Sequence, residues 1–195
     1  MKIVAVSDLH NIRPSLPDGD ILVIAGDATM SGTHSEITEF GRWLHKINHK
    51  FEYVLFTPGN HDFYFERWQK ESIVIDENIF FVINDTVRIN GINFWLSPYS
   101  NQFGAWAFMK REENLTKIWS QIPGDTDVIV THGPPKNVQD FTIGNVNVGS
   151  RSLLEKALEI KPKYHIFGHI HEAYGQSTIL GNKDKKYLLC QCFYN

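Results

Sequence analysis

Short apolar runs, each followed by a polar or glycine-containing cluster, recur along the chain. Continuous runs of this kind are typical of strands that are covered on both faces, as in buried parallel sheets. The sequence therefore predicts five buried strands, which cover residues 3–6, 21–25, 53–56, 128–130 and 164–167.

Three stretches with helical periodicity alternate with these strands. The first opens with a capping box, Thr33-His34-Ser35-Glu36, and places apolar residues at helical spacing from Ile37 to Ile47. The second covers about 110–121. The third begins at another capping box, from Ser152 to Glu155, and ends at Pro162.

Antiparallel pairing is predicted in two places. Asn90-Gly91 separates residues 86–89 from 92–96, which is a strong signal for a β-hairpin. Gly181-Asn182 plays a similar part before residues 187–192. Parallel-type strands, hairpins and crossover helices together indicate mixed sheets flanked by helices, that is, an α/β fold of the mixed α+β kind.

Length and composition indicate one globular domain over residues 1–195. A hydrophobic fraction of 42% and a charged fraction of 21% exclude a disordered chain and a coiled coil. The net charge of -3 gives no electrostatic reason to expect a nucleic-acid partner or binding to an anionic membrane. No apolar run approaches the roughly 20 residues of a membrane span, and the first eight residues do not form a secretory signal.

The two cysteines, Cys190 and Cys192, lie two residues apart in a strand-like run. They would share a face of the strand, where their separation fits disulfide geometry poorly. We therefore expect reduced thiols and a cytoplasmic location. The sequence does not indicate an oligomeric state.

The polar clusters after the five predicted strands contain three carboxylates, one amide and five imidazoles. In open α/β folds, ligands bind beyond the carboxyl ends of the strands, because the loops there converge. Nitrogen and oxygen donors of this kind suit Mn, Fe, Zn or Ni. The clusters are Asp8-Leu9-His10, Gly26-Asp27, Gly59-Asn60-His61-Asp62, His132-Gly133 and Gly168-His169-Ile170-His171.

The spacing within the clusters adds to this interpretation. Residues two apart on an extended chain point the same way, so Asp8-x-His10 and His169-x-His171 could each clasp one metal. Glycines at 26, 59 and 168 permit sharp turns and close backbone approach. Asp27 stands alone after its strand and is the natural carboxylate to bridge two ions. Any one cluster is common in proteins without a metal, but five after apolar strands in one chain are not.

The ordered series Asp-x-His, Gly-Asp, Gly-Asn-His-Asp, Thr-His-Gly and Gly-His-x-His resembles the calcineurin-like metallophosphoesterases. Ala25-Gly26-Asp27, residues 131–135 and residues 161–175 resemble the brain-type metallophosphoesterase-domain proteins, which are sometimes grouped with class III cyclic-nucleotide phosphodiesterases. The resemblance spans nearly the whole chain.

The resemblance implies a four-layer αββα double β-sandwich with a dinuclear metal site at the strand ends. It implies that His61 points at the substrate instead of at a metal, and that Asp62 orients His61. It also assigns the metal ligands. One ion would take Asp8, His10, Asp27 and His171, and the other would take Asp27, Asn60, His132 and His169.

The function expected from this resemblance is a metal-dependent phosphodiesterase that acts on small phosphodiesters, with cyclic nucleotides among the candidates. A metal-bridging hydroxide would attack phosphorus in line, and protonated His61 could donate to the leaving group. Two divalent ions are expected, Mn first, with Fe, Zn and Ni as the other choices. The expected partner is a small phosphoester substrate, with no membrane involved.

Two alternatives remain open from the sequence. The same dinuclear centre could serve a phosphomonoesterase or a nuclease, although a nuclease would be expected to carry a basic groove. The fold could also be a scaffold that hydrolyses nothing, a history that usually removes metal ligands.

Aromatic residues near the predicted mouth of the site are a further feature. They lie in Phe63-Tyr64, at Tyr99 and between Phe103 and Trp106. Residues 97–108 could form one wall on which a nucleobase stacks. His165 lies inside an apolar run, so we expect it either in the core or behind the metal ligands as a supporting residue.

Overall fold

The computed structural model describes residues 1–67, 77–181 and 185–191, and it describes only the backbone of 177–181 and 185–191. Four parallel strands form the first sheet, in the order β1-β2-β3-β4. They are β1 (Ile3–Val6), β2 (Ile21–Ala25), β3 (Tyr53–Thr57) and β4 (Ile79–Phe81).

The second sheet is mixed and has the order β11-β12-β10-β9-β6-β5. The pairs β5·β6 and β11·β12 are antiparallel, whereas β6·β9, β9·β10 and β10·β12 are parallel. A short parallel pair, β7·β8, lies apart from both sheets. These strands are β5 (Asp85–Ile89), β6 (Ile92–Ser97), β7 (Ser100–Asn101), β8 (Met109–Lys110), β9 (Val128–Thr131), β10 (Tyr164–Phe167), β11 (Gly175–Gly181) and β12 (Lys185–Gln191).

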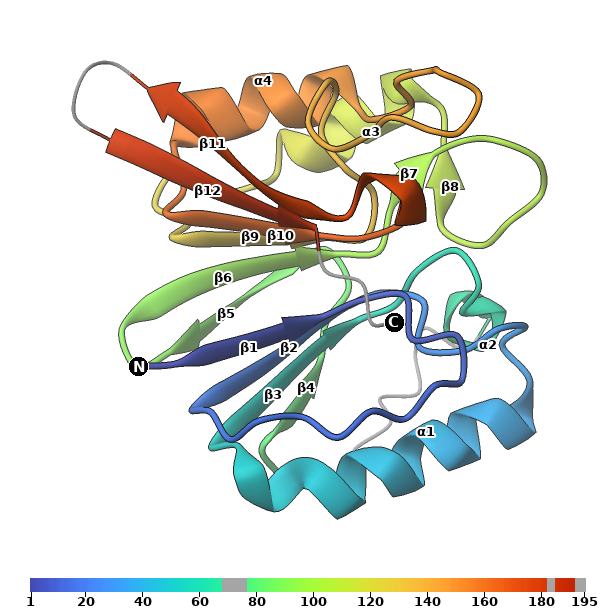
Figure 1. The fold of residues 1–195 in the computed structure, drawn as a ribbon. Helices are drawn as coiled ribbons and strands as arrows, with labels where there is room; N and C mark the ends of the chain where they lie inside the picture. Colours follow the sequence, from blue (N-terminus) through green and yellow to red (C-terminus); the bar gives the residue numbers. More distant parts are fainter. Residues whose placement is uncertain (68–76, 182–184, 192–195) are drawn as a thin grey trace.

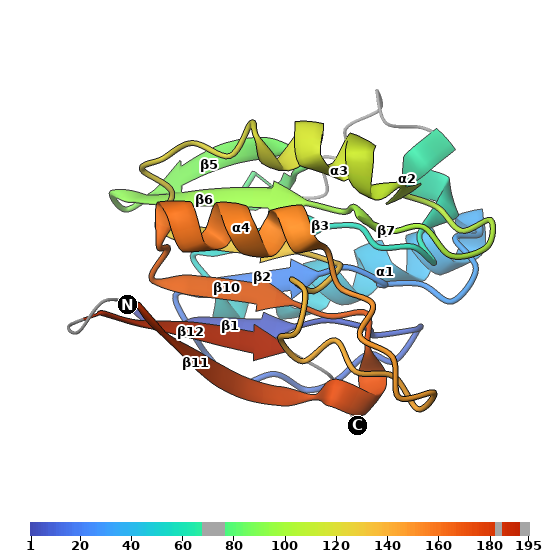
Figure 2. The ribbon, with the colours of Figure 1, turned by 90° about the horizontal axis from the view of Figure 1, so that it is seen from above.

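Helices cover the outer faces of the two stacked sheets (Figure 1). Helix α1 (His34–Ile47) lies on the first sheet, and α3 (Glu112–Trp119) and α4 (Arg151–Ile160) lie on the second (Figure 2). These four layers confirm the predicted αββα arrangement. The remaining helical segments are α2 (Phe63–Arg67) and the 3₁₀ turns η1 (Asn48–Lys50) and η2 (His171–Ala173).

Strand β2 shows why the predicted strands are apolar without interruption. Its odd-numbered residues, Ile21, Val23 and Ala25, join the core between the two sheets. Its even-numbered residues, Leu22 and Ile24, join the core beneath α1. Both faces are fully buried, so no position on this strand can be polar.

The structure confirms all five predicted strands as β1, β2, β3, β9 and β10. It also confirms the hairpin at Asn90-Gly91, where both residues have positive φ (49° and 81°), as a two-residue type I′ turn requires. Strands β11 and β12 pair antiparallel as predicted, but their turn lies outside the described residues. The same holds for the side chain of Cys190 and for Cys192.

The start of α4 differs from the prediction. The hydroxyl of Ser150, not that of Ser152, accepts the hydrogen bond from the N–H of Leu153 and caps the helix. Ser152 is already engaged, because both its N–H and its hydroxyl donate to Glu112 at 2.7 Å. Helix α3 is also shorter than predicted and covers Glu112–Trp119.

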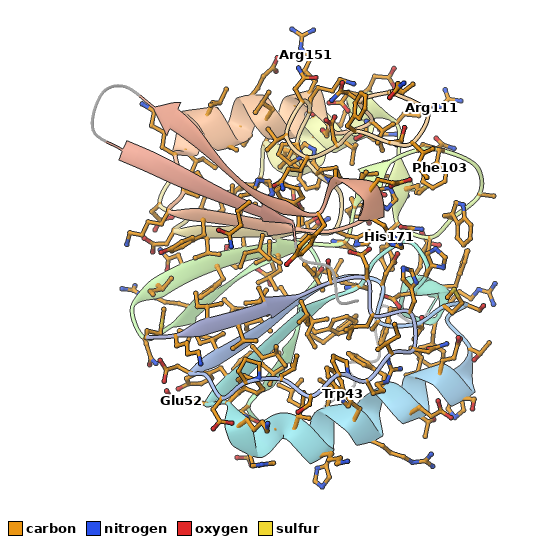
Figure 3. All side chains as sticks on the ribbon, in the orientation of Figure 1. Trp43, Glu52, Phe103, Arg111, Arg151 and His171 are labelled. Atoms are coloured by element: carbon orange, nitrogen blue, oxygen red, sulfur yellow. The ribbon has the colours of Figure 1, made fainter. Side chains whose placement is uncertain are left out.

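The parallel strands β1, β2, β3, β9 and β10 all end at one edge of the sandwich, on the right in Figure 1. His171 is labelled at this edge in Figure 3. The polar clusters that follow these strands therefore meet there. Among the described residues, no helix is long and apolar enough to cross a bilayer.

Candidate metal centre

All seven predicted metal ligands meet at the shared edge of the two sheets. Three groups of donors can be drawn in which every ligand atom lies within 4.8 Å of the others. The first group is Asp8, His10 and His171; the second is His10, Asp27 and His61; the third is Asp27, His132 and His169. Asn60 joins the third group through its side-chain oxygen, which lies 2.8 Å from Nε2 of His132.

The first site is built from residues after β1 and after β10. Nε2 of His171 lies 3.1 Å from Nε2 of His10 and 3.4 Å from Oδ1 of Asp8. Two imidazole nitrogens cannot both direct lone pairs at each other over this distance unless a proton or a cation lies between them. Together with Asp8, the pair forms a group of donors that could hold one ion.

Asp27 joins the two sites through a single oxygen. Its Oδ2 lies 3.8 Å from Nε2 of His10 and 3.3 Å from Nε2 of His132. Its Oδ1 accepts a hydrogen bond of 2.8 Å from the backbone N–H of His61. The sequence predicted that Asp27 could bridge two ions, and the structure directs Oδ2 toward both sites.

The distances between donors fit divalent transition-metal ions. Ligands about 2.1 Å from an ion lie roughly 3.0 Å apart at octahedral angles and roughly 3.4 Å apart at tetrahedral angles. The five donor separations given above, which come from both sites, run from 2.8 to 3.8 Å. Carboxylate, amide and imidazole donors without thiolate are the set preferred by Mn, Fe, Zn and Ni.

His169 and His171 fall in different groups of donors, contrary to the spacing argument. His169 belongs to the group with His132, whereas His171 belongs to the group with Asp8. The chain between them is not extended, because His169 has a φ of 79° and η2 begins at His171. The two imidazoles therefore diverge toward the two sites, in agreement with the assignment that the family resemblance implied.

Four of the predicted ligands have a left-handed backbone. The φ values are 54° at Asp8, 41° at His10, 53° at Asp27 and 79° at His169. Such conformations are costly for residues with a Cβ and cluster at functional sites. The surrounding fold therefore stabilises a local geometry that the chain alone disfavours.

Two glycines let the backbone approach the predicted ligands. A Cβ at Gly59 would overlap Oδ1 of Asp27, and a Cβ at Gly168 would overlap Oδ2 of Asp8. The sequence predicted close approach at both positions. Any larger residue there would displace a carboxylate from its site.

Hydrogen bonds fix the orientation of several predicted ligands. Nδ1 of His132 donates to the carbonyl of Ala25 at 3.0 Å, which leaves Nε2 free to bind an ion. The Ser7 hydroxyl donates to Oδ2 of Asp8, and the backbone N–H of His169 donates to Oδ1 of Asp8 at 3.0 Å. The sequence analysis missed Ser7, whose position before Asp8 was the only signal.

The side chain of Asp62 joins two loops of the site. It is fully buried and accepts hydrogen bonds from the N–H groups of Ala28, Thr29 and Gly59 and from the Thr29 hydroxyl. The family resemblance assigned the orientation of His61 to Asp62. In the structure, the ring of His61 instead donates from Nδ1 to the carbonyl of Met30 at 2.6 Å. A backbone carbonyl leaves no mark in the sequence, so Met30 was not predicted.

Burial and neighbouring charges shift the pKa values of several groups in this site. Burial disfavours the charged form of His132, but the carboxylate of Asp27 outweighs it and raises the pKa of His132 to about 9. Burial and the charge of Asp27 together raise the pKa of Asp62 to about 6. Burial and the neighbouring His132 lower the pKa of His169 to about 4. The site thus concentrates carboxylates and imidazoles at a density that divalent cations would stabilise.

The predicted aromatic residues divide between the site and the core. The rings of Trp106 and Phe103 contact His61 and His169, with centroid distances of 4.4 and 5.6 Å. Phe103 is 53% exposed and lies on the same side of the molecule as His171 (Figure 3). Tyr99 instead packs against the buried Phe108.

A cleft of about 690 Å³ lies beside the loop that carries His61. It does not include the predicted metal ligands. It is lined by Ser31, Gly32, Thr33, His34, Phe63, Tyr64 and Arg67.

Comparisons with known proteins agree with the fold and with the family that the sequence motifs resemble. A family model described as calcineurin-like phosphoesterase matches residues 1–173. Metallophosphoesterase domain-containing protein 1 of Homo sapiens is 30% identical over 203 residues, which cover 89% of this chain and 61% of that protein. A protein of Emericella nidulans named "Probable rhamnogalacturonate lyase C" is 35% identical over 205 residues, which cover 100% of this chain and 19% of that protein. The chain thus spans less than two thirds of the length of either relative.

Among solved structures, phosphopantetheinyl hydrolase from Mycobacterium tuberculosis has a TM-score of 0.58 at 16% identity, over 99% of this chain and 89% of that one. This similarity concerns the fold alone. The match over residues 1–173, on a fold whose strand ends gather the donors of two metal sites, shows that the chain belongs to the calcineurin-like phosphoesterase family, whose members hydrolyse phosphoric esters.

Proposed function

We propose that this protein is a phosphodiesterase that hydrolyses small phosphodiesters, with cyclic nucleotides among the candidates, and that it acts in the cytoplasm. The observation that supports this most directly is the position of Oδ2 of Asp27 between Nε2 of His10 and Nε2 of His132. A carboxylate oxygen shared between two groups of donors could hold the two ions of a two-metal hydrolase close together.

The residues present fit two divalent ions. Asp8, His10, Asp27 and His171 would hold one ion, and Asp27, Asn60, His132 and His169 would hold the other. When bound, such ions activate a water for attack on phosphorus and offset the charge of the phosphoryl oxygens. We infer Mn²⁺ as the first choice for both sites, with Fe, Zn and Ni as the other candidates.

His61 would supply the proton for the leaving group. Its Nδ1–H donates to the carbonyl of Met30, which can only accept, so Nε2 is the nitrogen that can face the substrate. When the bond between phosphorus and the leaving oxygen breaks, the electron pair stays on that oxygen, which takes the proton from Nε2 of His61. The imidazole is left neutral and regains a proton from solvent.

The net charge and the exposed aromatic ring favour a small diester over a nucleic acid. The chain carries a net charge of -3, whereas a nuclease would be expected to hold its polymer through a basic groove. Phe103 leaves half of its side chain exposed beside His169, which suits an organic group of the ester.

The experiment that tests this function is an activity matrix of metals and substrates. Protein stripped of metal is reconstituted with Mn, Zn, Fe or Ni. It is then assayed on bis(4-nitrophenyl) phosphate, on 2′,3′- and 3′,5′-cyclic nucleotides, on 4-nitrophenyl phosphate and on single-stranded DNA. We expect metal-dependent turnover of diesters, fastest with Mn. Faster turnover of the monoester or of DNA would refute the assignment, as would diester turnover that persists after the metal is removed.

A further inference from the structure

The ring of Trp106 lies against the ring of His61. The centroids are 4.4 Å apart and the two planes are tilted by 35°, a distance typical of offset-stacked rings. Phe63 lies on the same side, with its centroid 5.9 Å from that of Trp106. Trp106 itself is 38% exposed. One face of the indole is thus occupied by the residue that would protonate the leaving group.

Two other contacts restrict the imidazole of His61, and a third holds its backbone. Met30 accepts its Nδ1–H at 2.6 Å, and the ring of His10 meets it edge-on with centroids 4.6 Å apart. The backbone N–H of His61 is held by Asp27. None of these contacts covers the face of the ring that Trp106 covers. The terminal torsion of His61 is intrinsically broad, and without the indole its rotation would be opposed by the hydrogen bond to Met30 and the edge-on contact with His10.

The loop that carries Trp106 is anchored to the segment that carries His61. The N–H of Ala107 donates to the carbonyl of Asn60 at 3.1 Å, and the N–H of Phe108 donates to Glu66 at 2.8 Å. Ala107 and Phe108 are fully buried, so this end of the loop is fixed in the core. The indole is therefore presented to the imidazole by backbone that is already held in place.

We propose that Trp106 is a positioning residue, which holds His61 with Nε2 directed at the leaving oxygen. The proposal rests on the proposed function, in which His61 is the acid. If the imidazole of a proton donor rotates away from the leaving oxygen, even partly, proton transfer slows, because transfer requires hydrogen-bond distance in the transition state.

Removing Trp106 should have different kinetic effects if it positions His61 than if it stacks on the substrate. If Trp106 stacked on the organic group of the substrate, its removal would raise KM for substrates that contain an aromatic base. If it holds the acid, its removal lowers kcat, and lowers it most where the leaving group depends on a proton.

The test compares methyl phenyl phosphate with methyl 4-nitrophenyl phosphate, since phenolate needs protonation far more than 4-nitrophenolate does. For W106A we expect kcat to fall at least about 10-fold on the phenyl ester and less than about 3-fold on the 4-nitrophenyl ester, with KM within about 2-fold. W106F keeps a flat ring and should retain most of the activity on both esters. F141A, which removes an exposed aromatic side chain outside this loop, serves as the control.

A double-mutant cycle with His61 sharpens the test. H61A should show the same dependence on the leaving group, and the double variant W106A/H61A should be no slower than H61A alone, because Trp106 would act only through His61. Additive losses, equal losses on the two esters, or a rise in KM confined to base-containing substrates would each overturn the proposal.

A measurement on the metal-free protein separates this proposal from the proposed function. NMR signals of the His61 ring should show one orientation in the wild-type protein and in W106F, and exchange between orientations in W106A. Thermal unfolding of each variant checks that the fold is intact. If no ester is hydrolysed by the wild-type protein, the proposed function fails. If the His61 signals are the same with and without the indole, the positioning role fails.

Discussion

The backbone N–H of His61 donates to Oδ1 of Asp27 at 2.8 Å, so the predicted acid and the carboxylate shared by both metal sites are directly joined. The two oxygens of Asp27 therefore have different contacts. Oδ1 holds the loop after β3, and Oδ2 remains directed at the imidazoles of both sites. A change at Asp27 would therefore disturb the metals and the acid together.

Asp27→Asn should abolish the dinuclear centre. The amide keeps an oxygen that can accept from His61, but its NH₂ group cannot bridge two cations. We expect fewer than one ion per chain by elemental analysis, and at least a 100-fold loss of diester turnover, roughly the size of effects seen when metal ligation is disturbed. Asp18→Asn alters an exposed carboxylate away from the site and should leave both quantities unchanged. Two ions per chain in the Asp27→Asn protein would contradict this role.

Gly59→Ala should weaken metal binding without removing any ligand. The new Cβ would overlap Oδ1 of Asp27 and crowd His132, so the shared carboxylate must move. We expect at least about a 10-fold loss of affinity for Mn²⁺ by isothermal titration calorimetry. Gly124→Ala is the matched control, since a Cβ there meets nothing within 4 Å. Unchanged affinity in Gly59→Ala would show that the loop accommodates the new Cβ without any loss of Mn²⁺ binding.

Asp62→Asn should destabilise the fold around the site. Asp62 accepts four hydrogen bonds from the loops after β2 and β3. An amide side chain would place its NH₂ group, which cannot accept a hydrogen bond, opposite some of these N–H and O–H donors. We expect the free energy of unfolding to fall by about 2 kcal/mol or more in urea denaturation, because buried donors lose their acceptors. A stable Asp62→Asn protein with normal turnover would show that these bonds are dispensable.

His165 should make the stability of the protein fall in mild acid. It is fully buried in β10, and burial lowers its pKa to about 3, compared with roughly 6.5 in an unfolded chain. The unfolded state therefore binds the proton first. The contribution of His165 is fully present above pH 6.5 and is lost as the pH falls, at about 1.4 kcal/mol per pH unit.

The measurement is urea unfolding at pH 7.5, 6.5, 5.5 and 5.0, with a chelator present so that metal release does not contribute. His165→Gln should lower stability at neutral pH yet flatten its dependence on pH between 6.5 and 5.0. His49→Gln removes an exposed histidine and should leave the slope unchanged. Equal slopes in His165→Gln and the wild-type protein would rule out the linkage.

Local patterns in the sequence predicted the strands, the hairpin and the gathering of the polar clusters, because these depend on periodicity and on strand direction. The predictions that were wrong depended on contacts between residues that are distant in the sequence. Ser152 has the side chain of a helix cap, but Glu112, 40 residues away, engages it, and Ser150 takes its place. The orientation of His61 depends on a carbonyl of Met30, and any residue could provide that group.

The Asp8-x-His10 and His169-x-His171 pairs show a subtler limit. The spacing argument assumed extended backbone, whereas Asp8, His10 and His169 all have positive φ. Only the folded surroundings impose that conformation, so spacing alone put His169 and His171 on one ion, whereas the family resemblance divided them between two, as the donor groups are divided in the structure.

The first metal site joins residues that are 161 positions apart, His10 and His171. On the ribosome, the emerging chain thus exposes half of this site long before the other half exists. A chain that ends before His171, whether it is still being synthesised or has been cut by a protease, lacks one of the donors of this site. Binding of an ion by the complete first site would therefore have to follow synthesis of the chain through His171 and the folding that brings His171 to His10.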